Sequence, residues 1–342
     1  MRKIVIHSPG GYEKLRIEEF PDPVPGENEV VVQTVAAGVN YADCSVRWGV
    51  YESAKKFVGW PITPGFEFSG VIVARGKKAK HKLGTKVFGV SLFNSYATHV
   101  SVPEHQVYPL PKKLTAIQAA AFPAVHMTAY HALFQLVRIR ASGKILVHSA
   151  AGGVGSALLQ LARIAGLESV AVVGGAHKVA FAKDFGAHAV IDKSSENLWQ
   201  RARDLAPEGY DAILDANGYT TLKESYAQLA PTGKLIVYGS HSLLPKKGGR
   251  INYFKAGWGL LRTPRFNPLR MLSENKTVSG FNISFLFSRR DLLDEAMTDL
   301  LRWLAAGKLR PPAVTEVPFE NAAEAHRLIE SGKSVGKIVL VH

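Results

Sequence analysis

The feature that most constrains this chain is a glycine-rich turn between an apolar run and a segment with helical spacing. Residues 144–148 form the run, the turn reads Gly152-Gly153-Val154-Gly155, and apolar residues then recur at helical intervals to Ala165. A dinucleotide-binding turn requires a strand, a tight turn and a helix in this order. Gly152 and Gly153 can take positive φ and let the backbone approach a pyrophosphate, while Gly155 lets the helix pack closely on the strand. Because Ala150 stands in place of the first glycine of G-x-G-x-x-G, the motif alone is weak.

Strands and helices alternate regularly after this turn, with short loops between them. Such alternation predicts an α/β fold with a doubly wound parallel sheet. We therefore assign residues 125–269 to a nucleotide-binding domain. The expected strands are 144–149, 169–174, 188–192, 211–216 and 234–239, and the expected helices are 154–166, 177–185, 196–205 and 221–229.

Residues 1–124 read as mostly β, because short alternating or apolar runs are separated by Gly and Pro clusters. This pattern predicts a barrel-like β domain. Towards the other end of the chain, strand patterns return at 277–283 and 337–341, with helical patterns at 290–306 and 321–331. We expect residues 270–342 to complete the N-terminal domain.

The composition limits the classes of chemistry and partner that are open to the chain. Its 342 residues carry 42 Lys and Arg against 28 Asp and Glu, and the net charge of +14 favours anionic partners such as a phosphorylated cofactor or an anionic membrane surface. The single cysteine, Cys44, excludes a disulfide within the chain and a cysteine-rich zinc cluster, and the histidines show no metal-ligand spacing. We therefore expect no metal. We see no secretory signal and no apolar run of membrane-spanning length, so we expect a cytoplasmic protein and leave peripheral membrane association open.

The end of the second strand of the nucleotide domain selects between the two nicotinamide cofactors. An acidic residue there binds the ribose hydroxyls and disfavours a 2′-phosphate. Here the strand ends in Gly174-Gly175-Ala176-His177-Lys178, with no Asp or Glu, and Lys178 would attract the phosphate. The pattern favours NADPH over NADH. The alternative is that Lys178 is an ordinary solvated lysine at the start of a helix.

A basic segment, residues 243–271, interrupts the alternation. It contains seven Lys and Arg residues, no acidic residue and several interleaved aromatic residues. Three interpretations are open: a substrate lid or dimer loop with a solvated charged face, a surface that docks on anionic lipids, or a site for single-stranded nucleic acid. We favour the first, keep the membrane surface as an alternative and do not expect nucleic acid as a partner.

Short motifs occur in a recognisable order over nearly the whole chain. By these motifs it resembles the medium-chain dehydrogenase/reductase superfamily, in its zinc-independent quinone oxidoreductase branch. The basic segment after Ser240 and the Gly280-Phe281 that follows it make the chain most similar to the vesicle amine transport protein family within that branch. The motifs are Ala36-Ala37-Gly38-Val39-Asn40-Tyr41-Ala42-Asp43, Arg47-x-Gly49-x-Tyr51, Pro64-Gly65-Phe66-Glu67, Ala150-Ala151-Gly152-Gly153-Val154-Gly155, Tyr238-Gly239-Ser240 and Val335-Gly336-Lys337.

The resemblance implies a GroES-like β-barrel domain, a Rossmann domain, bound NADPH and a homodimer. It also implies that Asn40, Tyr51 and Thr128 lie near the nicotinamide. Lys193 stands where many quinone reductases have a tyrosine, and it would serve the adenosine phosphate by charge alone. The other implied cofactor contacts are Gly152, Gly153, Val154 and Gly155 at the pyrophosphate, Gly174, Gly175 and Lys178 at the 2′-phosphate, Gly239 and Ser240 at the ribose, and Phe281 and Lys337 near the cleft.

Departures from the zinc alcohol dehydrogenases narrow the chemistry that the resemblance implies. The cysteine ligand that those enzymes have near Asn40 is missing, and Phe66 replaces the histidine of their Gly-His-Glu motif, so we expect no zinc. Without that Lewis acid, an electron-poor conjugated acceptor is the easier substrate. We predict hydride transfer from NADPH to a quinone or to the β-carbon of an α,β-unsaturated carbonyl, with Tyr51 and Asn40 as the catalytic residues.

Alternatives without a catalytic role stay open for Tyr51, for Asn40 and for the protein as a whole. Tyr51 would then be an aromatic that only lines the cleft, and Asn40 would only cap a short helix. The protein would be an NADPH-binding protein that acts mainly through membrane, lipid or partner association, with little turnover.

Overall fold

A computed structural model describes residues 1–243 and 253–342 of the protein, with side chains described from residue 257 onward in the second range. The described residues form two compact units. The first comprises residues 1–124 and 310–342, and the second comprises residues 125–243 and 253–309. The first unit is therefore assembled from both ends of the chain.

The first unit is mainly β, as its short runs predict. Its helices are α1 (Tyr41–Arg47), α2 (Glu52–Phe57), α3 (Ala116–Ala120) and α12 (Ala322–Glu330). Its strands are β1 (Arg2–Val5), β2 (Arg16–Glu19), β3 (Glu29–Val39), β4 (Glu67–Arg75), β5 (Lys86–Val90), β6 (His99–Pro103), β7 (Val107–Pro109), β14 (Val314–Pro318) and β15 (Lys337–Val341).

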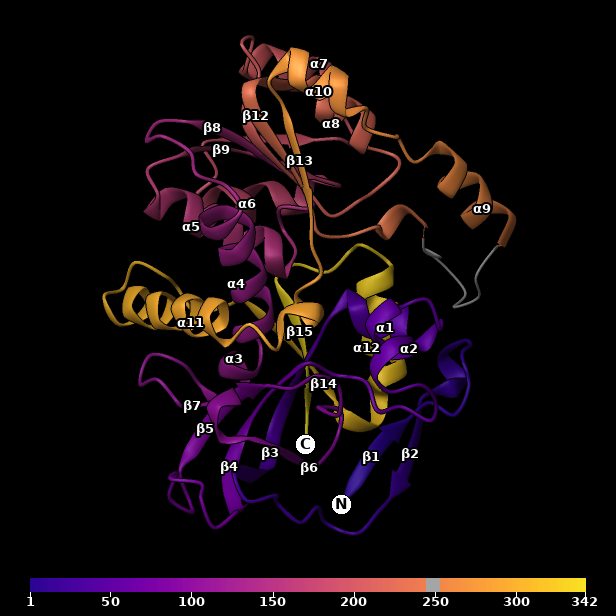
Figure 1. Cartoon of the computed structure of the whole chain (residues 1–342), viewed down its shortest axis with the longest axis vertical. Coiled ribbons are helices and arrows are strands. Elements are labelled where there is room, and N and C mark those ends of the chain that lie inside the picture. Colours follow the sequence, from indigo (N-terminus) through magenta and orange to yellow (C-terminus); the bar gives the residue numbers. More distant parts are fainter. Residues whose placement is uncertain (244–252) are drawn as a thin grey trace. The chain divides into compact units, whose positions relative to one another are not determined.

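One seven-stranded sheet organises the first unit. The strand order is β14-β15-β3-β4-β5-β7, and β6 also pairs with β3. In Figure 1 the C-terminal strand β15 (yellow) lies beside the N-terminal strand β3 (indigo), and their antiparallel register pairs Ile338 with Val39. This register brings the residues just outside it, Lys337 and Asn40, to the same end of the strand pair.

The second unit alternates strands and helices, as predicted. Its sheet strands are β8 (Lys144–Val147), β9 (Glu168–Val173), β10 (Ala189–Asp192), β11 (Tyr210–Asp215), β12 (Leu229–Val237) and β13 (Thr277–Gly280). Its helices are α4 (Pro123–Tyr130), whose first two residues belong to the first unit, α5 (Gly153–Ile164), α6 (Val179–Asp184), α7 (Leu198–Leu205), α8 (Leu222–Ala227), α9 (Tyr253–Arg262), α10 (Pro268–Glu274) and α11 (Arg290–Ala305).

All six strands of this sheet are parallel, in the order β10-β9-β8-β11-β12-β13. This is the Rossmann order, in which the first three strands are added towards one edge of the sheet and the next three towards the other edge. The strand order therefore reverses between β8 and β11. Apolar side chains fill the strands on both faces, and Leu146, Ile191 and Ile213 are fully buried. Ligands of such sheets bind at the carboxyl ends of the strands where the order reverses, which here are the ends of β8 and β11.

The domain boundary that we expected at residue 270 is wrong, because the first unit resumes only at residue 310. Two contacts hold residues 270–309 in the second unit. β13 pairs in parallel with β12, so that Thr277 lies opposite Lys234. α11 is bonded to the C-terminal end of α4 and the π-helical turn after it, where the Tyr130 hydroxyl donates to Asp299 Oδ2 at 2.9 Å.

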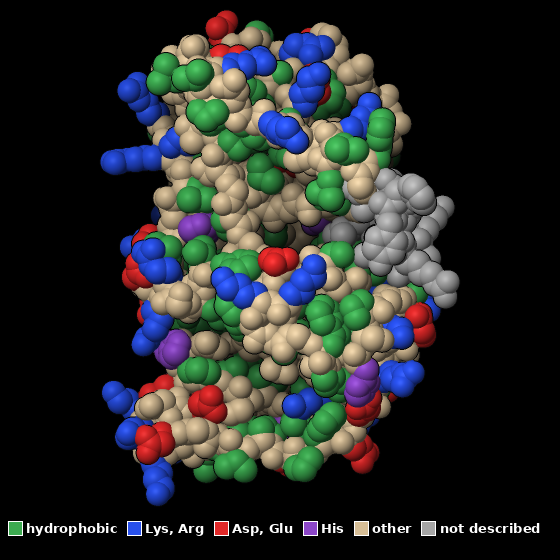
Figure 2. Space-filling view, turned by 45° about the vertical axis from the view of Figure 1, so that its right-hand side comes forward, with side chains coloured by type: hydrophobic (Ala, Val, Ile, Leu, Met, Phe, Trp, Pro, Cys, Tyr) green, Lys and Arg blue, Asp and Glu red, His purple; other side chains and the backbone are tan. Residues whose placement is uncertain are grey.

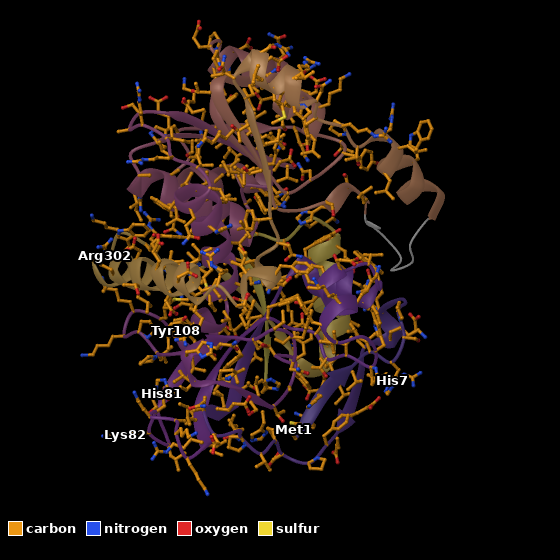
Figure 3. The ribbon with its side chains drawn as sticks, viewed as in Figure 1. Met1, His7, His81, Lys82, Tyr108 and Arg302 are labelled. Carbon is orange, nitrogen blue, oxygen red and sulfur yellow. The ribbon has the colours of Figure 1, made fainter. Side chains whose placement is uncertain are left out.

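Part of the basic segment 243–271 lies outside the described residues. Within the described part, two short helices, α9 and α10, replace the loop that the lost pattern suggested. Basic side chains elsewhere, such as Lys82 and Arg302, are exposed and point away from the body of their own unit (Figure 3). None of the helices in the described ranges has the length and apolar character needed to cross a membrane.

Candidate active site

The β8–α5 turn has the predicted order but a different residue in the left-handed region. Gly152 is the N-cap of α5 with φ −84°, and Gly153 is the first helical residue, so neither glycine uses the positive φ that is open to it. The left-handed residue is Ser149, with φ 54°. Gly155 must lack a side chain, because a Cβ there would lie 2.4 Å from the Ser149 carbonyl oxygen. The main-chain N–H groups of Gly153, Val154 and Gly155 open the helix and are available to an anion.

Two lysines converge beyond the ends of β9 and β10. Lys178 is only 9% exposed, and a Cβ added to Gly174 would lie 3.6 Å from Lys193 Cε. Burial lowers the pKa of Lys178, and the positive charge of Lys193 lowers it further. Gly175 leaves its main chain uncovered except for the ring of His177, 3.1 Å from where its Cβ would be. Two ammonium groups that repel one another beside bare glycine backbone form a favourable place for a dianion.

The acid next to these lysines is already engaged by its own loop. Asp192 follows Ile191 at the end of β10, and its Oδ1 accepts the main-chain N–H of Ser194 at 3.0 Å and the Ser194 hydroxyl at 2.7 Å. These hydrogen bonds lower the pKa of Asp192 and hold its carboxylate within the turn.

A buried polar network connects the carboxyl ends of β8 and β11, where the strand order reverses. Asp215, at the end of β11, accepts the hydroxyls of Thr221 at 2.7 Å and Ser225 at 3.0 Å through Oδ2. His148, just after β8, lies with Nε2 3.1 Å from Ser225 Oγ, and burial lowers the pKa of this imidazole. The network is sealed from solvent and ties the ends of β8 and β11 together, so it is structural.

Two residues at the reversal point were missed by sequence reasoning. The Ser149 hydroxyl donates to Asn217 Oδ1 at 3.0 Å, across the ends of β8 and β11. Gly239 lies against the same place, since a Cβ there would be 2.6 Å from Ala216 O, and Ser240 Cα lies 3.1 Å from a Cβ built on Gly218. The signal that could have found Ser149 and Asn217 is their position at the end of one expected strand, 144–149, and directly after another, 211–216.

Thr128 and Phe281 lie elsewhere in the second unit. Thr128 is in the last turn of α4. The ring of Phe281 follows β13 and contacts His131 at 4.7 Å and Tyr238 at 6.3 Å between centroids. The structure thus places Phe281 against the π-helical turn that follows α4 and against the residue that follows β12.

In the first unit, Asn40, Glu67 and Lys337 form one cluster. Asn40 is the N-cap of α1, and its main-chain N–H donates to Asp43 Oδ2 at 2.8 Å. Its side-chain Oδ1 accepts from Lys337 Nζ at 2.5 Å, and its Nδ2 donates to Glu67 Oε1 at 3.0 Å. Lys337 Nζ and Glu67 Oε1 are 2.7 Å apart, and both side chains are buried. Asn40 is half-buried, so it is the member of the cluster that reaches towards solvent.

Tyr51 stands near this cluster in the sequence but packs separately. It is the N-cap residue of α2, and its ring makes edge contacts with Phe66 at 5.7 Å and Phe93 at 6.4 Å between centroids. Its side chain is half-buried. The ring is therefore held by an aromatic group while the residue retains access to solvent.

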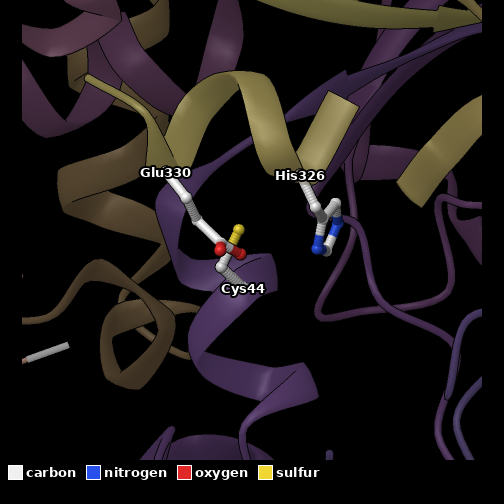
Figure 4. A group of neighbouring side chains, drawn as sticks. All are labelled: Cys44, His326 and Glu330. Carbon is white, nitrogen blue, oxygen red and sulfur yellow. The ribbon is translucent and has the colours of Figure 1, made fainter. Parts of the chain in front are cut away.

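A second buried cluster joins α1 to α12. Cys44, His326 and Glu330 offer ligand atoms within 4.8 Å of one another, and in the described part of the chain this is the one such group (Figure 4). Arg47 is already hydrogen-bonded to two of these three residues. Its Nη2 donates to Glu330 Oε1 at 2.7 Å, and its Nη1 donates to His326 Nδ1 at 2.8 Å. The Tyr12 hydroxyl donates to the second oxygen of Glu330 at 2.6 Å, so the acceptors of this cluster already hold a cation and a hydroxyl.

Each of the two units overlaps a known protein family in sequence. Residues 26–112 match the family described as alcohol dehydrogenase GroES-like domain, and residues 185–340 match the zinc-binding dehydrogenase family. The rat synaptic vesicle membrane protein VAT-1 homolog is 32% identical over the whole of this chain and 84% of its own length. Human quinone oxidoreductase is 29% identical, with 100% of this chain and 98% of the relative covered. The structure of Escherichia coli quinone oxidoreductase complexed with NADPH has a TM-score of 0.86 at 26% identity, with both chains fully covered.

The GroES-like unit and the Rossmann unit with its glycine turn define a medium-chain dehydrogenase/reductase, a superfamily of oxidoreductases. Quinone oxidoreductases share the full length of this fold. Within the superfamily, the chain belongs to the family of the VAT-1 homologs.

Proposed function

We propose that the protein is an NADPH-dependent, zinc-independent reductase of quinones or α,β-unsaturated carbonyls. Bound NADPH supplies a hydride and leaves as NADP⁺. A quinone that accepts the hydride and one proton becomes a hydroquinone, and an enone that accepts hydride at its β-carbon becomes an enolate that is then protonated at the α-carbon. The acceptor thus gains two electrons, and water or a nearby hydroxyl supplies the proton.

The observation that carries this proposal is the pair formed by Lys178 and Lys193 beside bare glycine backbone. A 2′-phosphate is the part of NADPH that NADH lacks, and two converging ammonium groups are suited to hold it. The start of α5, through Gly152 to Gly155, would hold the pyrophosphate. Ser149, Asn217, Gly239 and Ser240 line the reversal point, where the ribose would lie.

Zinc independence is supported by the basic side chains that pair with the two buried carboxylates of the first unit, Glu330 and Glu67. Both His326 Nδ1 and Glu330 Oε1 accept from the Arg47 guanidinium, and burial raises the pKa of the Cys44 thiol well above its ordinary value. Each zinc ligand needs a free lone pair, and a cysteine binds zinc only as the thiolate, so these residues do not fit the metal. At Glu67 the compensating charge is the Lys337 ammonium.

We propose that Tyr51 and Asn40 serve the acceptor. Tyr51 has a phenol on a ring that is held by Phe66 and Phe93, so its hydroxyl is suited to orient a carbonyl or donate the proton. Asn40 carries amide N–H groups that would polarise a carbonyl oxygen.

An acceptor screen tests the enzyme assignment. NADPH oxidation is followed at saturating cofactor with 9,10-phenanthrenequinone, 1,4-benzoquinone and a panel of enones. Turnover with at least one acceptor, reduced by Tyr51→Phe, is the expected result. Tight NADPH binding without turnover on any acceptor would leave the protein a binding protein and defeat the proposal.

Charge reversal tests the cofactor assignment. Lys178→Glu places a carboxylate where the 2′-phosphate would lie, and we expect the Kd for NADPH to rise at least about 100-fold, or 2.7 kcal/mol, with little change for NADH. The control is Lys183→Glu, an exposed lysine on the adjacent helix α6. Equal losses for both cofactors would show that Lys178 does not contact the phosphate.

A second function has its own support. α9 and α10 expose Trp258, Leu261 and Leu272, each by more than half of its surface, beside basic residues such as Arg262. Figure 2 shows hydrophobic and basic side chains next to one another on the surface just above the grey residues. Apolar side chains flanked by arginines are typical of a surface that docks on anionic lipids.

Vesicle binding tests this second function. We expect co-sedimentation with phosphatidylserine vesicles that weakens as salt rises and is lost in Leu261→Ser/Leu272→Ser. The control is Leu83→Ser, an exposed leucine in the other unit. Binding that persists in the double variant would place the membrane surface elsewhere.

We also propose that the protein is a homodimer. β13 ends the six-stranded sheet, and no described strand pairs with its outer side. Such an edge offers main-chain groups to a second copy. Light scattering should give twice the chain mass of 37.2 kDa, and a monomeric mass at micromolar concentration would contradict the proposal.

A further inference from the structure

The cluster of Asn40, Glu67 and Lys337 determines which atoms of the Asn40 amide face outward. Lys337 lies at the start of β15, and the β15–β3 register brings it beside Asn40. Its ammonium donates to three acceptors: Val39 O at 2.6 Å, Asn40 Oδ1 at 2.5 Å and Glu67 Oε1 at 2.7 Å. A lysine has three N–H donors, so Lys337 has none left for a cofactor. This removes the direct cofactor contact that the sequence suggested for it.

Both oxygens of the Glu67 carboxylate are also held by hydrogen bonds. Its Oε1 accepts from Lys337 and Asn40, and its Oε2 accepts the main-chain N–H of Ala124 at 2.9 Å. Gly38 makes the approach possible, because a Cβ there would lie 2.5 Å from Glu67 Oε1. The carboxylate is fully buried and cannot move away from Asn40.

The two charges admit one orientation of the Asn40 amide. If the amide were turned over, its NH₂ would face the Lys337 ammonium and its oxygen would face the Glu67 carboxylate, which are repulsive pairs. In the allowed orientation Oδ1 is held by Lys337 and one N–H by Glu67. The second N–H has no acceptor among the described residues, and Asn40 is the half-buried member of the cluster.

We propose that Lys337 and Glu67 are positioning residues that make Asn40 a hydrogen-bond donor, and not an acceptor, towards the molecule that it recognises. The group recognised is then a carbonyl oxygen. This inference rests on the proposed reductase function, and the oxygen has two sources, the carbonyl of the acceptor and the carboxamide of the nicotinamide.

The first test is Asn40→Asp, which keeps the size and the helix-capping ability of the residue but has no N–H to donate. Loss of a donor to a developing oxyanion lowers kcat by about 10²–10³-fold. An unchanged Kd for NADPH with that loss assigns the acceptor carbonyl, and a raised Kd for NADPH assigns the carboxamide. Activity within threefold of the wild type would overturn the donor role.

The second test is the neutral pair Lys337→Met/Glu67→Gln, which removes both charges together and so avoids an unpaired buried charge. We expect kcat/KM to fall about 10–100-fold, the range for losing an outer-shell partner, and to fall less than threefold further when the pair is placed in Asn40→Asp. Additive losses would show that the pair does not act through Asn40. The control is Lys78→Met/Glu27→Gln, a Lys–Glu pair with a similar separation, 2.6 Å against 2.7 Å, but exposed to solvent.

A spectroscopic measurement separates this inference from the reductase assignment. The ¹⁵N side-chain amide signals of Asn40, identified by their loss in Asn40→Asp, should show one proton that is protected from exchange with solvent, because it is donated to the buried Glu67 carboxylate. In Lys337→Met/Glu67→Gln this protection should be lost. A wild type that turns over no acceptor defeats the proposed function, whereas a wild-type Asn40 amide without a protected proton defeats the positioning role.

Discussion

The buried ion pair between Arg47 and Glu330 permits a quantitative prediction for Arg47→Met. The pair is 2.7 Å apart with side-chain exposures of 0% and 1%, so neither charge reaches water. Removing the arginine leaves Glu330 with the Tyr12 hydroxyl alone and leaves His326 Nδ1 without its donor. Breaking a buried pair by removing one partner costs about 3–5 kcal/mol. At a urea m-value of about 2 kcal/mol/M, the unfolding midpoint of the first unit should fall by roughly 2 M.

Urea unfolding, followed by circular dichroism, measures this effect. Arg47→Met/Glu330→Met removes both charges, and it should recover at least half of the loss because a well-packed apolar pair replaces the ions. The control is Arg2→Met, which breaks a pair of similar length, 2.8 Å, that is about half exposed and should cost less than about 1 kcal/mol.

Two results would refute this reasoning. One is a loss below about 1 kcal/mol in Arg47→Met, which would mean that water reaches Glu330. The other is destabilisation of the wild type by a chelator, because it would place a metal ion where the guanidinium lies.

Three further changes have definite expected outcomes. Burial and the charge of Arg47 lower the pKa of His326, so its contribution to stability is present above the unfolded pKa and is lost as pH falls. In His326→Gln the loss of stability on acidification should therefore be smaller than in the wild type, by up to about 1.4 kcal/mol per pH unit below pH 6.5. Urea titrations at pH 8, 6 and 5 would measure the difference. Gly155→Ala would force its Cβ against Ser149 O at 2.4 Å, so we expect NADPH affinity to fall at least tenfold in a fluorescence titration while Gly280→Ala, where the nearest atom is 3.9 Å away, leaves it unchanged. Tyr12→Phe removes a 2.6 Å hydrogen bond to a buried carboxylate and should lower the free energy of unfolding by about 1.5–3 kcal/mol; a change below 0.5 kcal/mol would contradict that role.

Local patterns predicted most of the helices and strands, because the spacing of apolar residues that distinguishes a strand from a helix is a property of neighbouring residues in the sequence. The alternation after residue 144 predicted the Rossmann unit, and its strands appear at the expected positions. The assignment of 277–283 to the other domain failed for a physical reason: seven residues of strand pattern do not specify which sheet edge they will join. Here β12 offered that edge.

The site could be predicted only where its residues follow strands. The glycine turn and Lys178 are local signals, because the acid-free end of β9 pointed to Lys178, whereas Lys193 was named only through the resemblance. Ion pairs across the chain leave no such signal, since Arg47 and Glu330 are 283 positions apart and Asn40 and Lys337 are 297 apart. Lys337 read as a cofactor contact because its partners, Glu67 and Asn40, are visible only in three dimensions.

The assembly of the first unit from both chain ends has a consequence for its biosynthesis. A ribosome adds about 5–20 residues per second, so the 297 positions between Asn40 and Lys337 correspond to roughly 15–60 s during which β3 lacks β15. In that interval Arg47 and Glu67 have no counter-charge, and one edge of β3 is open to other strands. The second unit, by contrast, has all of its strands before residue 281 and can fold while the first still waits. A nascent chain stalled after residue 309 should therefore carry a folded Rossmann unit attached to an N-terminal segment that remains a target for chaperones and proteases.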